Sequence, residues 1–335
     1  MRNQCPVFVV GCHRSGTNLL YDTLLSAGGF AIYRGYLPIY KMLVPKFGAL
    51  SNPENRRKIV DTWLRSKGYR RSGLDAASLR RKLLAEACSA GDFMRIVMEE
   101  ICGAQGVARW ALYDADNLLY ISRIKRDIPE AIFVHMIRDG RDIALSLKKM
   151  GAFTPFFWNR RPGSLKETAI YWEWIVRKGR EQGLKVPADY IEVQYEELVT
   201  NPAKELKRLG AFIDHDLNYD RIQSAALGSL SSTNSSFRGE HASINPVNRW
   251  KQVLSAQETA QLEALIGSFL EELGYTLNTR GATRSFMKPW SRRFYTGFLE
   301  AKLWAKVNTP LGRFTSVAPL ELEHSAPGAP NSITV

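Results

Sequence analysis

One stretch near the start of the chain limits the folds that are open to it. Residues 7–10 read Val-Phe-Val-Val, and this β-branched apolar run predicts a short buried strand. Gly11 and Gly16 bound the turn that follows, and leucines recur at helical spacing from Leu19 onward. A strand, a Gly-x-x-x-x-Gly turn and a helix form a phosphate cradle, because the turn amides and the helix N-terminus point at one anion.

The turn differs from the P-loop of nucleotide triphosphatases at one informative place. That motif ends in lysine followed by serine or threonine, whereas this chain has Thr17 and Asn18 there. The cation of this turn is Arg14, inside the loop. We therefore expect a phosphate-like anion that is bound without the usual lysine and magnesium-binding hydroxyl.

Charge and cysteine content narrow the class of protein. A net charge of +13 over 335 residues points to anionic ligands, acidic polymers or a membrane surface. Zinc-finger spacing, zippers and RNA-binding aromatic motifs do not occur, so we expect no nucleic-acid partner. The four cysteines have no metal-ligand spacing, and no apolar run reaches the ~20 residues that span a bilayer. We expect a cytoplasmic protein with no metal, able to contact a membrane peripherally.

The rest of the chain predicts a three-layer α/β/α fold with a central parallel sheet and a helical insertion, similar to P-loop proteins. Further strands are expected at 131–137 and 190–193, and helices at 55–66, 75–90, 92–102, 118–127, 164–182 and 256–273. The predicted organisation is one α/β domain over 1–283, with the helical insertion at 33–108, then a basic helical segment over 284–313 and a disordered tail over 314–335.

The segment 284–313 stands apart in composition, with seven basic residues and one acid. Its apolar residues recur at helical spacing, as in Tyr295, Leu299 and Leu303. Such a basic amphipathic helix can lie on an anionic membrane, or it can pack on the domain with a solvated basic face. Both interpretations remain open from the sequence.

Three motifs in order resemble the sulfotransferase family that uses 3′-phosphoadenosine 5′-phosphosulfate. Residues 11–17 (Gly-Cys-His-Arg-Ser-Gly-Thr) are similar to that family's 5′-phosphosulfate loop, and residues 137–147 to its 3′-phosphate motif. Residues 195–202 resemble a third signature, so the resemblance covers roughly residues 5–275. It implies transfer of a sulfuryl group to a hydroxyl of a glycan, glycolipid or small metabolite, by in-line displacement without a metal. It also implies that the insertion shapes the acceptor pocket.

The resemblance and the chemistry together assign the nucleotide-binding residues. Arg14 would stabilise charge on the transferred group, and the amides of Ser15, Gly16 and Thr17 would hold the 5′-phosphate. Arg138 at a strand end can fork onto the 3′-phosphate, with an ion pair to a neighbouring aspartate as the alternative. The remaining nucleotide-binding candidates are Asn18, Ser146, Tyr195, Arg238 and Gly239. Of these, Asn18 departs from the family's usual second threonine, and Tyr195 could instead be a core tyrosine.

The general base is where the sequence departs from the family. Related enzymes place a glutamate some two dozen residues after the loop, but no Asp or Glu occurs here between Asp22 and Glu54. We expect the base to be Asp114 or Asp116, with Asp114 as the base and Asp116 as a helix N-cap. His13 is a third candidate. Two further functions stay open, a small-molecule kinase with a degenerate P-loop and an inactive nucleotide-binding homologue.

Overall fold

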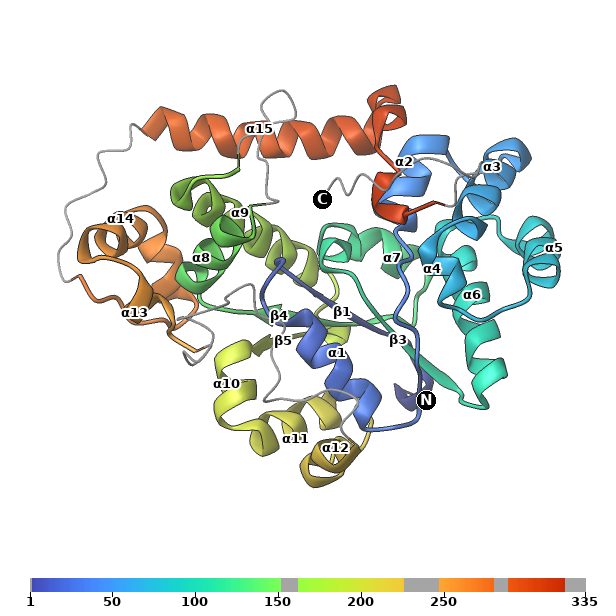
Figure 1. Ribbon diagram of the computed structural model, residues 1–335, viewed down its shortest axis with the longest axis horizontal. Coiled ribbons are helices and arrows are strands. Elements are labelled where there is room, and N and C mark those ends of the chain that lie inside the picture. Colours follow the sequence, from blue (N-terminus) through green and yellow to red (C-terminus); the bar gives the residue numbers. More distant parts are fainter. Residues whose placement is uncertain (1, 152–161, 226–246, 280–288, 323–335) are drawn as a thin grey trace, which may run out of the picture.

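The structure is a computed structural model that describes residues 2–151, 162–225, 247–279 and 289–322 (Figure 1). The predicted contact residues Arg238 and Gly239 lie outside the described residues. Within them, no helix is long and apolar enough to cross a bilayer.

A five-stranded sheet with parallel pairing throughout forms the centre of the molecule (Figure 1). The spatial order of the strands is β2-β3-β1-β4-β5, so the first strand of the chain lies in the middle. This confirms the predicted α/β class with a central parallel sheet. The strands are β1 (Val7–Gly11), β2 (Phe30–Ala31), β3 (Arg109–Tyr113), β4 (Ile132–Ile137) and β5 (Tyr190–Gln194).

Helices cover both faces of the sheet, giving three layers. The described helices are α1 (Thr17–Ser26), α2 (Val44–Phe47), α3 (Pro53–Leu64), α4 (Lys67–Arg70), α5 (Ala76–Glu86), α6 (Ala90–Gln105), α7 (Ile121–Asp127), α8 (Gly140–Met150), α9 (Leu165–Gly183), α10 (Tyr195–Thr200), α11 (Pro202–Ile213), α12 (Tyr219–Ala225), α13 (Trp250–Val253), α14 (Ala256–Glu272) and α15 (Pro289–Asn308). Shorter 3₁₀ turns include Ala115–Tyr120, Pro310–Phe314 and Ala318–Leu320, and Ile39–Leu43 forms a π-helical turn.

Alternating side chains of β1 divide the core into two parts. Val7 and Val9 point to the face covered by α1 and α11 and belong to one buried cluster. Phe8 and Val10 point to the opposite face and join the larger cluster, which includes residues of α6, α8, α9 and α14. Both sides of β1 are therefore buried, which is why its sequence is a continuous apolar run.

The helices of the insertion lie close to where the sequence predicts them, but the strand β3 was not predicted. Helices α3, α5 and α6 lie within four residues of the bounds expected at 55–66, 75–90 and 92–102. Residues 109–113 were not expected to form a strand, because Arg109 and a short apolar run carry no clear period. In the structure Arg109 bonds the backbone carbonyls of Cys5 and Ile213, which satisfies its buried guanidinium.

The predicted disordered tail is wrong for residues 314–322. Residues 310–314 and 318–320 form 3₁₀ turns, and Leu320 is buried in the larger core cluster. Glu321 also pairs with Lys67 of α4. Val317 and Leu322 pack against the same cluster, so several apolar contacts hold this segment on the domain.

Gly140 at the start of α8 gives a test of how the sheet edge is packed. A Cβ placed there would lie 2.4 Å from the Trp172 ring, whereas one at Gly103 in α6 would meet no atom within 4 Å. We expect Gly140→Ala to lower the free energy of unfolding by about 1–3 kcal/mol. Gly103→Ala should be neutral or stabilising by up to about 1 kcal/mol. Urea denaturation of both variants measures this, and equal effects would contradict the packing described.

Candidate functional site

The two phosphate motifs lie side by side because their strands are neighbours. In the register of β1 and β4, Gly11 is opposite Met136, so both strands end at the same edge. The loop after β1 and Arg138 after β4 therefore emerge together. The ends of β3 and β5 add Asp114 and Tyr195 at this carboxyl edge, where open α/β sheets bind their ligands.

The loop after β1 has the backbone of an anion-binding turn. Arg14 and Gly16 both have positive φ, at 74° and 100°, and Gly16 is the N-cap of α1. The first amides of α1, at Thr17 and Asn18, have no partner within the helix and lie at its positive end. A Cβ at Gly16 would come within 2.5 Å of the Tyr195 ring, so position 16 accommodates only glycine.

Ser15 has a different role from the one predicted. Its amide donates to the carbonyl oxygen of Cys12 at 3.1 Å, so this amide closes the turn and is not available to a ligand. Its hydroxyl is fully buried and has no hydrogen-bond partner among the described residues. A buried hydroxyl without a partner is costly, and an oxyanion seated in the loop would supply the missing acceptor. The loop therefore fits a phosphate or sulfate group.

Direct contacts join the residues predicted to bind the two ends of a nucleotide. Arg14 Nε donates to Ser146 Oγ at 3.1 Å, and Arg138 Nη1 donates to the Arg14 carbonyl oxygen at 3.3 Å. The Arg138 guanidinium also lies 4.2 Å from the centroid of the Tyr195 ring. Residues from β1, β4, α8 and α10 thus meet at one place, although they are far apart in the sequence.

The guanidinium groups at this place repel one another. Burial and the charge of Arg138 both lower the pKa of Arg14. Burial and the charge of Arg138 also lower the pKa of Arg249, which comes from the turn before α13. A bound polyanion would relieve this repulsion, because like charges held close together destabilise each other's charged forms. Sequence reasoning missed Arg249, since a single arginine before Trp250 belongs to none of the three motifs.

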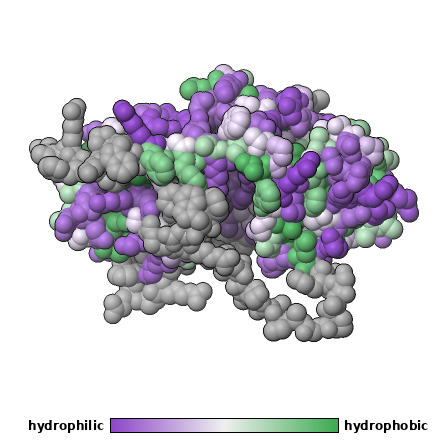
Figure 2. Space-filling view, turned by 90° about the horizontal axis from the view of Figure 1, so that it is seen from above, coloured by the Kyte–Doolittle hydropathy of each residue, from purple (hydrophilic) through white to green (hydrophobic). Residues whose placement is uncertain are grey.

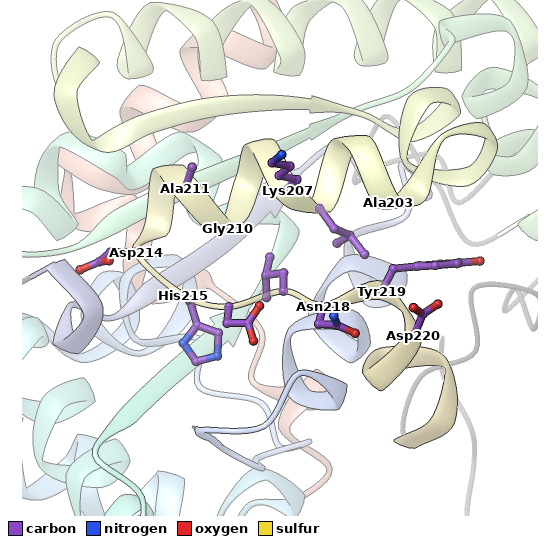
Figure 3. A pocket seen from close by; sticks show the side chains of 12 residues that line it. Ala203, Lys207, Gly210, Ala211, Asp214, His215, Asn218, Tyr219 and Asp220 are labelled. Atoms are coloured by element: carbon purple, nitrogen blue, oxygen red, sulfur yellow. The ribbon is translucent and has the colours of Figure 1, made fainter.

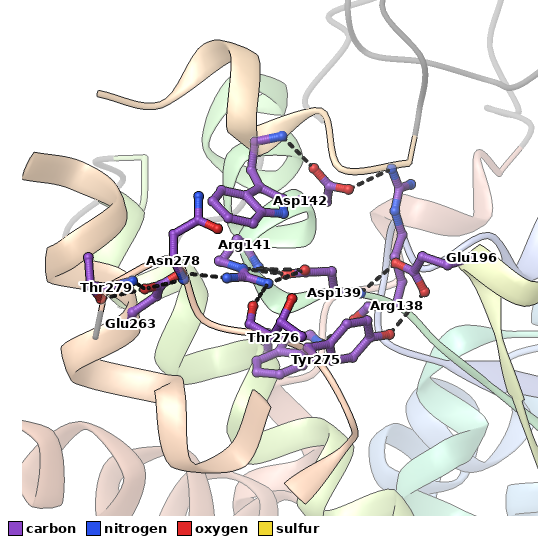
Figure 4. Close-up of polar contacts among 12 residues, drawn as sticks. Arg138, Asp139, Arg141, Asp142, Glu196, Glu263, Tyr275, Thr276, Asn278 and Thr279 are labelled. Atoms are coloured by element: carbon purple, nitrogen blue, oxygen red, sulfur yellow. Dashed lines mark hydrogen bonds and ion pairs between the residues drawn. The ribbon is translucent and has the colours of Figure 1, made fainter. Parts of the chain in front are cut away.

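A polar network holds the start of α8 in place beneath these cations (Figure 4). Arg141 is buried and pairs with Asp139 and Glu263, while its guanidinium packs on the Trp250 ring at 3.7 Å. The Trp250 amide donates to Asp142 Oδ1 at 2.8 Å. Asp142 in turn lies 3.7 Å from Arg138, which is the ion pair weighed as the alternative role of that arginine. The pair is long, so it orients Arg138 without occupying all of its donors.

The helix cap after β3 is Asp114 and not, as the sequence predicted, Asp116. Asp114 is the cap, because its carboxylate accepts the amide of Asp116 at the start of the 3₁₀ turn. Asp116 is not a cap: its carboxylate pairs with Lys41 and, at 3.2 Å, with His13. The prediction that Asp116 caps a helix is therefore wrong, since the helix α7 begins only at Ile121. Lys41 comes from the π-helical turn of the insertion, and nothing in its sequence context marked it.

The pKa values of the two carboxyl groups are shifted in opposite directions. Burial raises the pKa of Asp114, and its Oδ2 atom has no hydrogen-bond partner among the described residues. Burial also acts on Asp116, but the charges of Lys41 and His13 lower its pKa below the ordinary value. The charge of Asp116 conversely raises the pKa of His13. Asp114 is thus the better proton acceptor, and Asp116 is a fixed negative charge.

A cavity of about 360 Å³ connects Asp114 with the phosphate loop. His13, Thr17 and Asn18 line it on the loop side, and Lys41 and Arg71 line it on the insertion side. Pro319, Leu320 and Glu321 from the C-terminal segment complete the wall. A second pocket of about 610 Å³ lies between α11 and α12 and shares no residue with this site (Figure 3). Among the described residues, no group of His, Cys, Asp and Glu is placed to hold a metal ion.

The fold and the site together define an α/β protein that gathers several arginines at the edge of its sheet, beside a buried carboxyl group. Residues 6–219 match the sulfotransferase family model, which covers well over half of the chain, and the chain belongs to this family. This membership confirms the resemblance drawn from the three motifs. It places the chain among transferases.

The similar proteins are distant. The chain is 25% identical over 215 residues to a Caenorhabditis briggsae protein named "Putative protein-tyrosine sulfotransferase", a match covering 62% of this chain and 65% of that protein. A Caenorhabditis elegans protein of the same name is 26% identical, with 46% and 56% covered. The chain thus spans less than two thirds of these relatives. The sulfotransferase domain of the Synechococcus PCC 7002 olefin synthase is 14% identical, with a TM-score of 0.47 and coverage of 81% and 95%.

Glu196 belongs to the same polar network, because its carboxyl group accepts the Asp139 amide and the Tyr275 hydroxyl, both at 3.0 Å (Figure 4). Its buried position makes the stability of the site depend on pH. Burial raises its pKa to about 7 from an ordinary 4.5, so the folded chain keeps a proton that the unfolded chain loses between these values. The free energy of unfolding should therefore fall as pH rises through this window. Glu196→Gln should flatten the fall, whereas Glu197→Gln at the exposed neighbouring position should not. Urea midpoints between pH 4.5 and 8 measure this, and parallel curves for all three proteins would contradict it.

Proposed function

We propose that the chain transfers a sulfuryl group from 3′-phosphoadenosine 5′-phosphosulfate to an acceptor hydroxyl. The observation that carries the proposal is the contact of Arg14 with Ser146 and of Arg138 with the Arg14 carbonyl. These contacts bring a loop suited to a 5′-phosphosulfate next to an arginine suited to a 3′-phosphate. A ligand with a single phosphate would need only the loop, and not the second arginine.

The residues at the sheet edge fit such a nucleotide. The Gly16 and Thr17 amides, the Ser15 hydroxyl and Arg14 would hold the 5′ group, and Asn18 lies beside them in the cavity wall. Arg138, Ser146 and Arg249 would hold the 3′-phosphate, with Tyr195 packed against Arg138 and Gly16. Bound there, the nucleotide supplies a sulfuryl group on a good leaving group.

The protein's own groups would carry the remaining steps. Asp114 would take the proton of the acceptor hydroxyl as that oxygen bonds to sulfur, and the bond from sulfur to the 5′-phosphate oxygen breaks. Arg14 would stabilise the charge that develops on this leaving oxygen, as a preorganised donor does best in a water-poor site. The Lys41–Asp116–His13 cluster would keep the cavity wall charged and fixed opposite Asp114. The mechanism calls for no metal ion.

Several acceptor classes fit the cavity between the insertion and the C-terminal segment. A glycan, a glycolipid or a small metabolite would present the hydroxyl that the chemistry requires. The names of the two curated relatives add a peptide tyrosine to the acceptors worth testing. The cavity wall carries cations at Arg34, Lys67 and Arg71, which supports including acceptors with negative charge.

Calorimetry with the product nucleotide tests the proposal. Because Arg14 and Arg138 supply the charge, 3′-phosphoadenosine 5′-phosphate should bind without magnesium and at least tenfold more tightly than ATP with magnesium. Magnesium-dependent ATP binding with no affinity for the bisphosphate would instead indicate the kinase alternative.

Separate substitution of the two aspartates tests the assignment of the base. Asp114→Asn should reduce transfer of radiolabelled sulfate by about 10²–10⁴-fold while nucleotide affinity stays within about threefold, since only the proton acceptor is lost. Asp116→Asn should lower the free energy of unfolding by about 1–3 kcal/mol, because Lys41 loses its partner. In the wild type, turnover should rise with pH through the raised pKa of Asp114.

Two outcomes would count against this assignment. Full turnover by Asp114→Asn would show that another group is the base. Nucleotide binding by the wild type, with no transfer to any acceptor of a broad panel, would favour an inactive homologue.

A further inference from the structure

The outward face of α15 is unusually apolar for a surface helix. Among the described residues, seven large apolar side chains are strongly exposed, and four of them lie between residues 294 and 314. These are Phe294 at 60% exposure, Trp304 at 62%, Leu311 at 59% and Phe314 at 85%. Single exposed apolar residues are ordinary, but such a concentration on one short segment marks an interaction surface.

The helix has two distinct sides. Its inner side packs on the domain through Tyr295 and Leu299, both buried in the larger core cluster. Its outer side carries Phe294, Gly297, Ala301 and Trp304, which recur every three or four residues and are all exposed. The outer apolar stripe is therefore additional to the one that packs α15 onto α9. In Figure 2, which looks onto the side of the molecule where α15 lies, a band of apolar residues crosses this face.

Basic side chains accompany the outer stripe. Arg293 and Arg313 are exposed, and neither forms an ion pair with a carboxylate of the described chain. The single acid of α15, Glu300, is engaged by Trp174 and Lys178 of α9. The surface thus combines aromatic and aliphatic side chains with positive charge that no carboxylate among the described residues neutralises.

We propose that this face, formed by α15 and the turn over Pro310–Phe314, docks on the surface of a bilayer that contains anionic lipid. Aromatic side chains enter the boundary between headgroups and acyl chains, and the exposed arginine side chains meet the anionic headgroups. Charge complementarity favours this occupant over a second copy of the chain, because two such basic faces would repel each other. The proposal does not depend on the transfer reaction.

Truncation of the segment would not test this cleanly. Leu320 is buried in the core and Pro319 lines the cavity beside Asp114, so removal of the C-terminal segment would disturb both. Substitutions at exposed positions avoid that problem. Leu184, which is 78% exposed at the end of α9, offers a matched apolar control outside the proposed face.

The test is sedimentation of the full chain with phosphatidylcholine vesicles, with and without phosphatidylglycerol. The wild type should sediment with the anionic vesicles, and binding should weaken as salt rises. The double variant Trp304→Ser/Phe314→Ser should lower the partition constant at least tenfold, because two aromatic anchors are lost. Arg293→Gln/Arg313→Gln should lower it by about tenfold or more, whereas Leu184→Ser should leave it unchanged.

A second measurement distinguishes docking through this face from nonspecific adsorption to vesicles. With brominated lipids, the wild type should lose tryptophan fluorescence on binding, and Trp304→Phe should bind equally well but be quenched less. Lack of binding by the wild type, or equal binding by all variants, would overturn the proposal. So would a dimer that dissociates in the Trp304→Ser/Phe314→Ser variant while vesicle binding is absent.

Discussion

Two arginines, Arg14 and Arg138, meet at the carboxyl edge of the sheet, where the Arg138 side chain bonds the Arg14 carbonyl oxygen, and much of the surrounding structure keeps them there. The parallel register of β1 and β4 fixes the distance between the two strand ends. Mutual repulsion and burial make this arrangement unfavourable for the empty protein, as the lowered pKa of Arg14 indicates. This unfavourable energy would be relieved by a bound polyanion, as in a preorganised anion site.

The supporting shell explains how a chain tolerates such a site. Arg141 is buried between Asp139 and Glu263, and its ion pairs hold the first turn of α8 against the core. Trp172 donates to the Arg138 carbonyl and packs on Gly140, so the backbone just before the helix cannot shift. Each contact restrains the backbone around Arg138 while its guanidinium stays at the site. Residues that are not predicted to contact the ligand thus offset the electrostatic repulsion between the arginines of the site.

The extent to which the sequence predicted this structure depended on how local each signal was. The strand–loop–helix at residues 7–20 and the second motif after β4 are local patterns, and both appeared where expected. Lys41 and Arg249 were missed because their roles arise from the insertion and the turn before α13 folding back onto the edge. The cap was assigned to Asp116 instead of Asp114 because the 3₁₀ turn Ala115–Tyr120, which precedes α7, was not foreseen. The pairing of Asp116 with Lys41 could not be predicted, because Lys41 is distant in the sequence.

The central claim is that Arg138 binds the 3′-phosphate of the nucleotide while the loop binds its 5′ group. The most direct measurement is a calorimetric cycle that compares 3′-phosphoadenosine 5′-phosphate with adenosine 5′-phosphate, in the wild type and in Arg138→Gln. The account predicts that the wild type prefers the bisphosphate by about 10–100-fold, as charge-assisted hydrogen bonds allow, and that Arg138→Gln loses most of this preference. An unchanged preference in Arg138→Gln would contradict the account.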